Sequence, residues 1–238
     1  MVFKLGGPGR SGIKNKKTNR PWWPDLEPKC VLYFPMNEGG GTFLRDHSGQ
    51  NNHGTIHGAS WSKGEALDFD GSDDYISVAD SPSLDINSEI TISVWVNLRT
   101  NPDPGPNYAI VVGKTATYPT SLLYDRSANK RYVWVGGDDD YIASTSGLAP
   151  ENDGWHHIVA TWATGSNLLI YVDGVLNGTS TKVYSGDMWD NSNNVLIGGG
   201  VADRYLNGII DEVMVFNEAL TAAQIKDLYE KGRSKHGV

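Results

Sequence analysis

The chain has 238 residues, of which 39% are hydrophobic and 10% aromatic, proportions that exclude a disordered or a collagen-like protein. Its formal net charge of −8 argues against a nucleic-acid partner. Cys30 is the single cysteine, so an internal disulfide framework is excluded, and no run of about 18 apolar residues predicts a membrane span.

The charge is unevenly distributed along the chain. Residues 1–20 hold six of the 20 basic side chains and no acidic one, which leaves 14 basic against 28 acidic residues, a net −14, for residues 21–238. Glycines and a proline interrupt the first dozen residues, so neither a helix nor a strand is expected there. An extended basic N-terminal arm, residues 1–30, is therefore predicted to precede an acidic body.

The arm lacks the hydrophobic surface to fold on itself, so it is expected to be a disordered tail or to lie on a neighbouring protein subunit. Nucleic acid is the weaker partner, because no aromatic residues alternate with the lysines. No apolar run of about 7–15 residues follows the lysines, so no secretory signal peptide is predicted. The side chains expected to bind a partner are Lys14, Lys16, Lys17, Arg20, Trp22 and Trp23.

From Val31 onward, apolar residues alternate with a period of two, which predicts β-strands. Aliphatic residues at alternate positions over 90–98 indicate one buried face, and Trp95 belongs to the other. A similar alternation over 168–172 precedes Asp173-Gly174, which is typical of a type I′ hairpin turn. Further strands are expected at 54–59, 66–70, 74–79, 108–114, 121–125, 131–136, 141–145, 155–163, 194–198 and 208–216.

One helix is predicted near the C-terminus. Thr221 and Gln224 have the spacing of a capping box, and Leu220 with Ile225 has that of a hydrophobic staple. Gly232 is expected to end the helix, so that residues 233–238 would form a C-terminal tail.

The whole pattern predicts an all-β fold, because many short strands with regular turns are typical of sandwiches and jelly rolls. Residues 31–232 are expected to form one two-sheet antiparallel β-sandwich that includes the short C-terminal helix. The extended arm precedes it, and no linker divides it.

Five strings stand out within this body: FPMNEGGGT at 34–42, LDFDGSDDYI at 67–76, GWHHIVAT at 154–161, LIYVDG at 169–174 and GIIDEV at 208–213. In order and spacing they resemble the laminin-G-like domains of the concanavalin A-like lectin/glucanase superfamily, over about residues 31–232. The resemblance implies a concanavalin A-like jelly roll of two curved antiparallel sheets. It does not fix the function, because the fold hosts glycan-binding modules, adhesins and glycosidases.

Catalysis is not expected. A retaining glycosidase needs two carboxyl groups about 5 Å apart, and the glucanases that the chain resembles carry a Glu-x-Asp-x-x-Glu string that is missing here. The nearest imitation is Asp68, Asp70 and Asp73, but the intervening Gly71-Ser72 is expected to turn the chain and point Asp73 elsewhere. No Gly-x-Ser-x-Gly elbow occurs. The protein is therefore predicted not to be an enzyme.

Asp211 and Glu212 interrupt the otherwise apolar last strand, and alternation places them on opposite faces. A buried carboxylate must be hydrogen-bonded, paired or metal-bound. Relatives with the resembled fold often hold a structural calcium ion between the first and last strands, which implies Glu38, Asp46 and Asp211 as Ca²⁺ ligands. The other interpretation is that Asp211 pairs with an arginine or caps backbone groups.

Aromatic side chains in polar, loop-like stretches predict a sugar-binding surface, because sugars stack on exposed rings beside polar groups. These aromatics could instead cover an end of the sandwich or contact a neighbour. Trp95, Trp155 and Trp162 lie within strands and are expected to pack in or on the sheets. The candidate glycan-binding residues are Tyr184, Trp189, Arg204 and Tyr205.

Two functions of different classes remain. The first is a non-catalytic structural or adhesion protein, such as a virion decoration protein, whose arm anchors to a neighbouring subunit and whose sandwich faces outward. Laminin-G-like domains normally work outside cells, and a released virus particle carries its proteins there without a signal peptide. The second is a free-standing carbohydrate-binding module for cell-surface polysaccharide, and a glycoside hydrolase ranks third. The expected location is the virion surface, or else the extracellular space or the cytoplasm.

Overall fold

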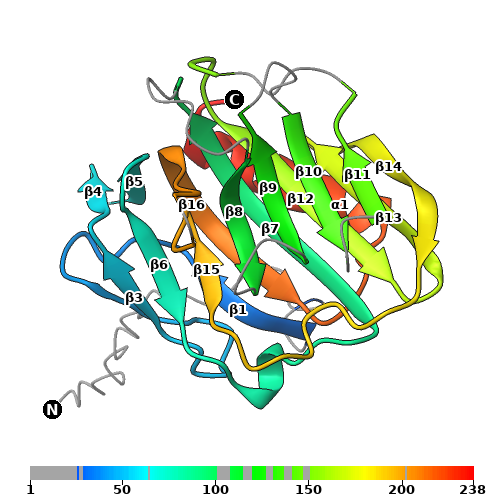
Figure 1. Ribbon diagram of the computed structural model, residues 1–238. Coiled ribbons are helices and arrows are strands. Elements are labelled where there is room, and N and C mark those ends of the chain that lie inside the picture. The colour runs from blue at the N-terminus through cyan, green and yellow to red at the C-terminus, as the bar shows by residue number, and fades with distance from the viewer. Residues whose placement is uncertain are drawn as a thin grey trace, which may run out of the picture.

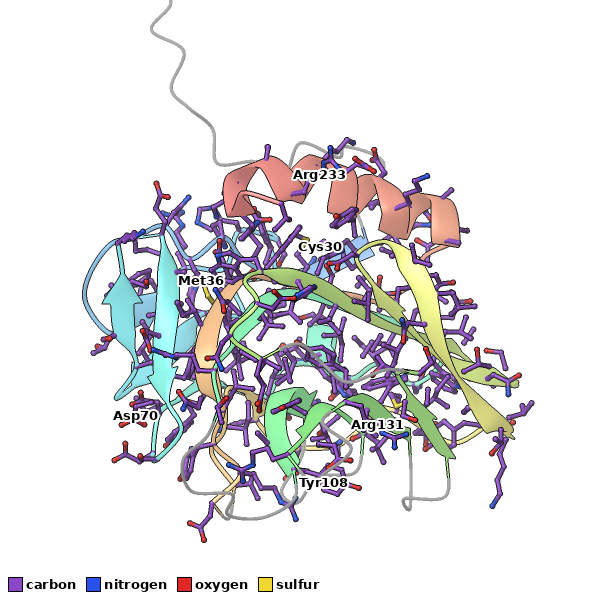
Figure 2. All side chains as sticks on the ribbon, turned by 90° about the horizontal axis from the view of Figure 1, so that it is seen from above. Cys30, Met36, Asp70, Tyr108, Arg131 and Arg233 are labelled. Atoms are coloured by element: carbon purple, nitrogen blue, oxygen red, sulfur yellow. The ribbon has the colours of Figure 1, made fainter. Side chains whose placement is uncertain are left out.

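The computed structural model describes Leu26 and residues 29–63, 65–100, 108–114, 120–126, 131–136, 141–146, 151–201 and 203–238. Two antiparallel sheets face each other, and the helix α1 (Ala222–His236) lies against the outer face of the first sheet (Figures 1 and 2). This arrangement confirms the predicted all-β sandwich with one C-terminal helix. Nowhere in the described ranges is a helix long and apolar enough to cross a membrane.

The first sheet carries the helix. Its strands are β1 (Cys30–Phe34), β4 (Ser60–Ser62), β5 (Ala66–Asp70), β7 (Glu89–Leu98), β12 (His156–Ala163), β13 (Ser166–Val172), β14 (Val175–Tyr184) and β16 (Asn207–Phe216). Their order is β14-β13-β12-β7-β16-β5-β4, and β1 pairs with β16.

The second sheet faces the first and contains the remaining strands. Its strands are β2 (Phe43–Leu44), β3 (Gly54–His57), β6 (Tyr75–Val78), β8 (Tyr108–Lys114), β9 (Ser121–Asp125), β10 (Arg131–Gly136), β11 (Tyr141–Ser144) and β15 (Val195–Ile197), in the order β11-β10-β9-β8-β15-β6-β3-β2. A short 3-10 helix, η2 (Pro82–Leu84), lies between β6 and β7.

The alternating pattern identified the strands correctly. Each strand for which it predicted a range is present, with bounds that differ by at most two residues. The aliphatic face of β7 packs in the core between the sheets, while Trp95 on its other face is buried against α1. Asp173 and Gly174 both have positive φ angles, 51° and 76°, as a type I′ turn requires.

The last strand departs from simple alternation. Its pairing with β7 shifts register between Asp211 and Met214, and Glu212 has a φ of +48°, which together mark a β-bulge. Ile210 faces the core before the bulge and Val213 faces it afterwards. The prediction that the two acidic residues lie on opposite faces is therefore wrong, because the extra residue turns both carboxylates toward α1.

The helix begins as predicted but ends later. Thr221 is the N-cap of a complete capping box with Gln224, and the left-handed residue that ends the helix is Gly237, with a φ of 74°. Gly232 instead lies inside the helix, where a Cβ atom would come 2.6 Å from Trp95 Nε1. The glycine permits close approach of the helix to the sheet, so residues 233–236 are helical rather than part of a tail.

A second apolar cluster fills the space between the first sheet and the helix. Ile225 and Leu228 of α1 pack there with Met214 and Phe216 of β16. Leu26, which precedes the first strand, is buried in the same cluster. The body of the protein therefore includes at least this residue of the region predicted to be arm.

Candidate functional site

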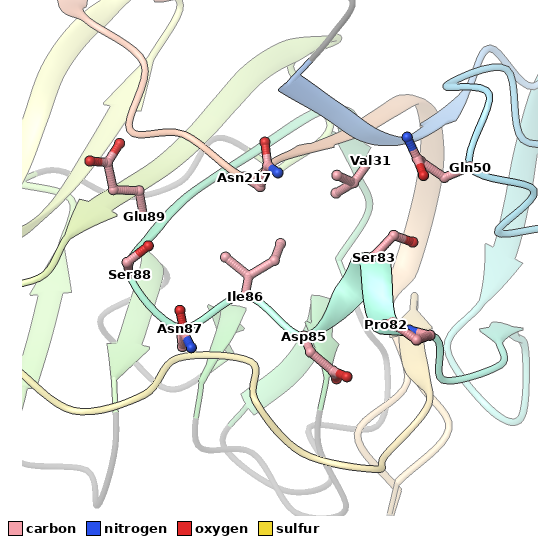
Figure 3. A pocket seen from close by; sticks show the side chains of 10 residues that line it. All are labelled: Val31, Gln50, Pro82, Ser83, Asp85, Ile86, Asn87, Ser88, Glu89 and Asn217. Atoms are coloured by element: carbon pink, nitrogen blue, oxygen red, sulfur yellow. The ribbon is translucent and has the colours of Figure 1, made fainter.

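A polar pocket of about 370 Å³ opens beside the connection between β6 and β7 (Figure 3). Residues 82–88 of that connection, with Glu89 at the start of β7, supply most of its lining, and Val31, Gln50 and Asn217 supply the rest. Seven of its ten lining residues carry amides, hydroxyls or carboxylates: Gln50, Ser83, Asp85, Asn87, Ser88, Glu89 and Asn217.

The middle of the pocket is apolar. Figure 3 shows the side chains of Val31 and Ile86 within the ring of polar groups. Both aliphatic residues belong to the core between the sheets, so they form a fixed floor. Gln50, Asn87 and Asn217 are exposed around it. The pocket thus combines a small apolar surface with several hydrogen-bonding groups.

Buried residues hold the pocket's Ser83 in place. The side-chain amide of Asn52 donates to Ser83 Oγ at 2.8 Å and to the Val31 carbonyl at 2.7 Å. The Asn52 backbone N–H in turn donates to Asp46 Oδ2 at 2.9 Å. Asn52 and Asp46 are both buried. Asp46 therefore helps to position Ser83 through Asn52.

A buried lysine holds the pocket's Asp85. Lys114 is completely buried, and its Nζ lies 2.5 Å from Asp85 Oδ1 and 2.7 Å from Asp80 Oδ1. The same ammonium donates to the carbonyls of Leu84 and Trp189 at 3.2 and 3.1 Å. These four acceptors satisfy the charge, and they fix η2 and Asp85 relative to the second sheet.

The pocket suits a ligand with many hydroxyl groups. Amides both donate and accept hydrogen bonds, whereas ionised carboxylates only accept them. A pocket of a few hundred cubic ångströms with a few fixed polar groups has the size of a small-molecule site. Of the pocket residues, the sequence singled out none, because they come from four segments that only the fold brings together.

The predicted calcium ligands Glu38, Asp46 and Asp211 have different partners. Glu38 Oε1 accepts the Arg45 backbone N–H at 2.9 Å. Asp46 accepts three backbone N–H groups and one hydroxyl, so the protein itself uses both its oxygens. In the described part of the chain, no group of metal-ligating side chains contains any of the three. Calcium binding by this trio stays a prediction that the arrangement does not favour.

Asp211 is paired with two residues of α1, Lys235 and His236, in place of the arginine considered from the sequence. Its Oδ2 lies 2.8 Å from Lys235 Nζ and 2.9 Å from His236 Nε2, and its Oδ1 accepts the Glu212 N–H. Burial lowers the pKa of Lys235, but the carboxylates of Asp211 and Glu212 outweigh it and raise that pKa overall. We call Asp211, Glu212, Lys235 and His236 the helix clasp.

The His236 ring completes the helix clasp. Its Nδ1 lies 3.0 Å from the Gly232 carbonyl oxygen and its Nε2 lies 2.9 Å from Asp211 Oδ2. The ring stacks on Trp95 with centroids 4.1 Å apart. A cleft of about 460 Å³ beside Trp155 reaches the clasp. Because the charged groups of the clasp already bind one another, we interpret them as holding the helix rather than a ligand.

Of the three aspartates considered for catalysis from the sequence, Asp73 takes an unexpected position. Asp73 was expected to point away from Asp70, but the structure places carboxylate oxygens of Asp70, Asp73 and Asp74 within 4.8 Å of one another. Asp74 Oδ2 accepts the Asp70 N–H at 2.9 Å, which folds the turn back. Burial, followed by the nearby carboxylates, raises the pKa of Asp74. Asp68 instead binds the guanidinium of Arg99.

Two predicted glycan-binding aromatics are not available to stack on a sugar. Trp189 is completely buried, and its indole N–H donates to the Thr120 carbonyl at 2.9 Å. Tyr184 is also buried, and its hydroxyl donates to the Asp187 carbonyl at 2.7 Å. Each ring's polar hydrogen is donated to a backbone carbonyl, which allows both rings to be buried in the core. The expectation that they lie on an exposed loop is therefore wrong.

The other two predicted residues, Arg204 and Tyr205, are partly exposed. Tyr205 packs against Gly199, and Tyr75 packs against the next residue, Gly200. Burial, followed by the nearby Tyr75, raises the pKa of Tyr205. Tyr75 was not identified from the sequence, because it lies in a strand. This surface is a second place where a sugar could stack.

The predicted partner-binding residues lie outside the described residues. They are Lys14, Lys16, Lys17, Arg20, Trp22 and Trp23. Their role stays a prediction from the sequence.

His157 is a buried neutral histidine beneath α1. Its Nε2 lies 2.8 Å from Ser93 Oγ. Burial lowers its pKa to about 3; nearby Asp173 opposes this shift, and His236 adds to it. An unfolded histidine has a pKa of about 6.5, so on acidification the unfolded chain binds a proton that the folded protein does not. This part of the stability is complete above about pH 6.5 and is lost progressively toward pH 3.

Replacing His157 with glutamine is expected to reduce the loss of stability in acid. Between pH 6.5 and 5 the histidine should lower the free energy of unfolding by about 2 kcal/mol, at about 1.36 kcal/mol per pH unit. Urea denaturation at each pH measures the difference in slope. The partly exposed His47→Gln variant is the control for loss of a histidine outside this buried site. Equal slopes for wild type and His157→Gln would contradict the prediction.

Comparison with known proteins agrees with the sandwich. A laminin-G family model, described as the concanavalin A-like lectin/glucanases superfamily, matches residues 70–226. The adhesion G-protein coupled receptor D1 of Homo sapiens is 30% identical over 104 residues, which are 42% of this chain and 12% of the receptor. The chain thus spans about an eighth of that relative.

Solved structures share the fold at low sequence identity. A Trypanosoma rangeli sialidase in complex with sialic acid has a TM-score of 0.66 at 18% identity, over 85% of this chain and 33% of the sialidase. The binding domain of Paraclostridial Mosquitocidal Protein 1 has a TM-score of 0.58 at 16% identity, over 87% of this chain and 53% of that chain. These likenesses concern the fold alone.

Proposed function

Because this chain belongs to the concanavalin A-like lectin/glucanases superfamily, we propose that it binds carbohydrate, without cleaving it, in the polar pocket of Figure 3. The observation that carries the proposal is the ring of seven polar side chains around an apolar floor. A sugar presents hydroxyls at its rim and C–H groups on its faces, and the pocket offers a matching surface to each.

The contacts of the pocket's two carboxylates support a binding role over a catalytic one. Glycoside hydrolysis needs one carboxyl group that gives up a proton and a second that acts as base or nucleophile. Asp85 is bound to the Lys114 ammonium, and Glu89 accepts the Ala219 backbone N–H at 3.2 Å. Both contacts use the carboxylate as an acceptor, which suits positioning rather than proton donation.

The test is glycan binding by the full chain with pocket variants. A glycan array identifies a ligand, and calorimetry then measures its affinity for wild type, Asn87→Ala and Asn217→Ala. Each variant removes an exposed amide from the rim, and we expect about tenfold weaker binding, equivalent to about one lost hydrogen bond. Exposed Asn37 lies outside the pocket, so Asn37→Ala should bind as wild type does.

Two outcomes would overturn the proposal: no glycan bound by the array, or wild-type affinity in both pocket variants. Tyr205→Ala examines the surface beside Tyr75. If that variant alone loses binding, the sugar binds there instead of in the pocket. Release of reducing ends from the bound glycan would show that the protein cleaves its ligand.

We also propose that the basic arm anchors the sandwich to a neighbouring subunit. The support is the contrast between six basic residues in 1–20 and a net −14 in the rest of the chain. Display on a virion surface stays a prediction from the sequence. Deletion of residues 1–20 should abolish co-purification with the assembled particle while leaving glycan affinity unchanged, and retention of the deleted form on the particle would refute the anchoring role.

A further inference from the structure

We infer that the polar pocket selects neutral saccharides and disfavours those that carry a carboxylate, an inference that rests on the proposed function. Two of the lining side chains, Asp85 and Glu89, are carboxylates. Among the residues that the structure describes, no lysine, arginine or histidine lines the pocket. An acidic sugar would therefore bring a third negative charge to a site that offers it no cationic partner.

The buried cation that contacts Asp85 does not make the charge of the pocket positive. Lys114 contacts Asp85 directly, but its side chain is completely buried. Its ammonium is shared among Asp80, Asp85 and two backbone carbonyls. With its donors used on the protein side, Lys114 has none to offer a ligand. Asp80 adds a further negative charge beside the same ammonium.

Lys29, a partly exposed cation whose backbone contacts the pocket residue Asn217, is also paired. Lys29 forms an ion pair with Glu218, and its carbonyl accepts the backbone N–H of the pocket residue Asn217. This lysine does not line the pocket, and its partner carboxylate offsets its charge. The described groups in and behind the pocket thus sum to a negative charge, as does the body of the protein.

The rim also offers both hydrogen-bond donors and acceptors to a neutral sugar. Gln50, Asn87 and Asn217 supply amide N–H donors, and the carboxylates supply acceptors for sugar hydroxyls. A carboxylate on the sugar has only acceptors, so it could use the amides but not Asp85 or Glu89. The pocket therefore favours a neutral sugar both by its charge and by its hydrogen-bonding pattern.

The experiment is a glycan array that carries each backbone in a neutral form and in a form with a uronic or sialic acid. We expect the neutral member of each bound pair to bind at least tenfold more tightly. The preference should shrink from 20 mM to 500 mM salt, because salt screens interactions between exposed charges. Equal or tighter binding of the acidic members would overturn the inference while leaving the proposed function intact. Binding of no member would overturn both.

A matched pair of variants assigns the effect to the pocket. Glu89→Gln removes one charge and keeps an oxygen that can accept the Ala219 N–H, so the preference for neutral members should fall severalfold. Glu65 lines the separate cleft beside Trp155, so Glu65→Gln changes the net charge of the protein equally and should leave the preference unchanged. The same reduction in both variants would show that the overall charge, not the pocket, rejects acidic sugars.

Discussion

Replacing Lys114 with methionine is expected to lower the free energy of unfolding by about 3–5 kcal/mol, the usual cost of breaking a buried ion pair from one side. Methionine fills most of the space but cannot donate to Asp80 and Asp85 or to the two carbonyls that the ammonium now binds. Equilibrium denaturation in guanidinium chloride, followed by tryptophan fluorescence, measures the loss.

The control for this variant is Lys231→Met on the outer surface of α1. Lys231 pairs with Asp227 at i,i+4, and both side chains are substantially exposed, so the expected loss is about 0.5 kcal/mol or less. A loss for Lys114→Met as small as that of the control would show that Asp80 and Asp85, each about one-third exposed, turn to water without cost.

Replacing Asp211 with alanine is also expected to lower the free energy of unfolding by about 3–5 kcal/mol, because it removes the anionic side of a buried ion pair. The change leaves Lys235 without one of its two carboxylates and the His236 ring with an unpaired nitrogen in a buried site. The C-terminal turn of α1 should loosen first, because the helix clasp joins that turn to the bulge of β16. Hydrogen exchange of residues 232–236 measures that local effect beside the global stability.

Two controls separate the explanations for Asp211. Asp227→Ala removes a carboxylate from the exposed face of the same helix and should change stability by about 0.5 kcal/mol or less. Thermal melts in EDTA test the calcium prediction, because a carboxylate that serves the helix clasp needs no ion. A midpoint that falls in EDTA by as much as in Asp211→Ala would favour the calcium role instead.

The sequence was informative wherever a local rule decides the structure. Strand positions follow from alternation, since each strand buries one face. The turn at Asp173-Gly174 follows from the backbone angles that two residues must adopt. The start of α1 follows from the capping box of Thr221 and Gln224. Each of these features depends on residues that are close together in the chain.

Features that depend on distant contacts were not predictable in this way. The local sequence predicts that Gly232 ends the helix, but the role of this glycine depends on its contact with Trp95 of β7. Trp189 reads as an exposed loop residue because its acceptor at Thr120 is 69 positions away. The bulge at Glu212 places Glu212 on the same helix side as Asp211 without any signal in the alternation. The pocket likewise exists only after four segments meet.

The edges of the two sheets bear on how this protein behaves when many copies are crowded together. An open edge strand can pair with the edge of another molecule and begin aggregation. On one side the edges are short, since β4 has three residues and β2 has two. On the other side β14 lies against β11, with Gly178 so near Ser144 that a Cβ would come 2.3 Å from its carbonyl oxygen. These four described edge strands thus offer a neighbouring molecule little open backbone, a property that would limit strand-to-strand polymerisation of crowded copies through them.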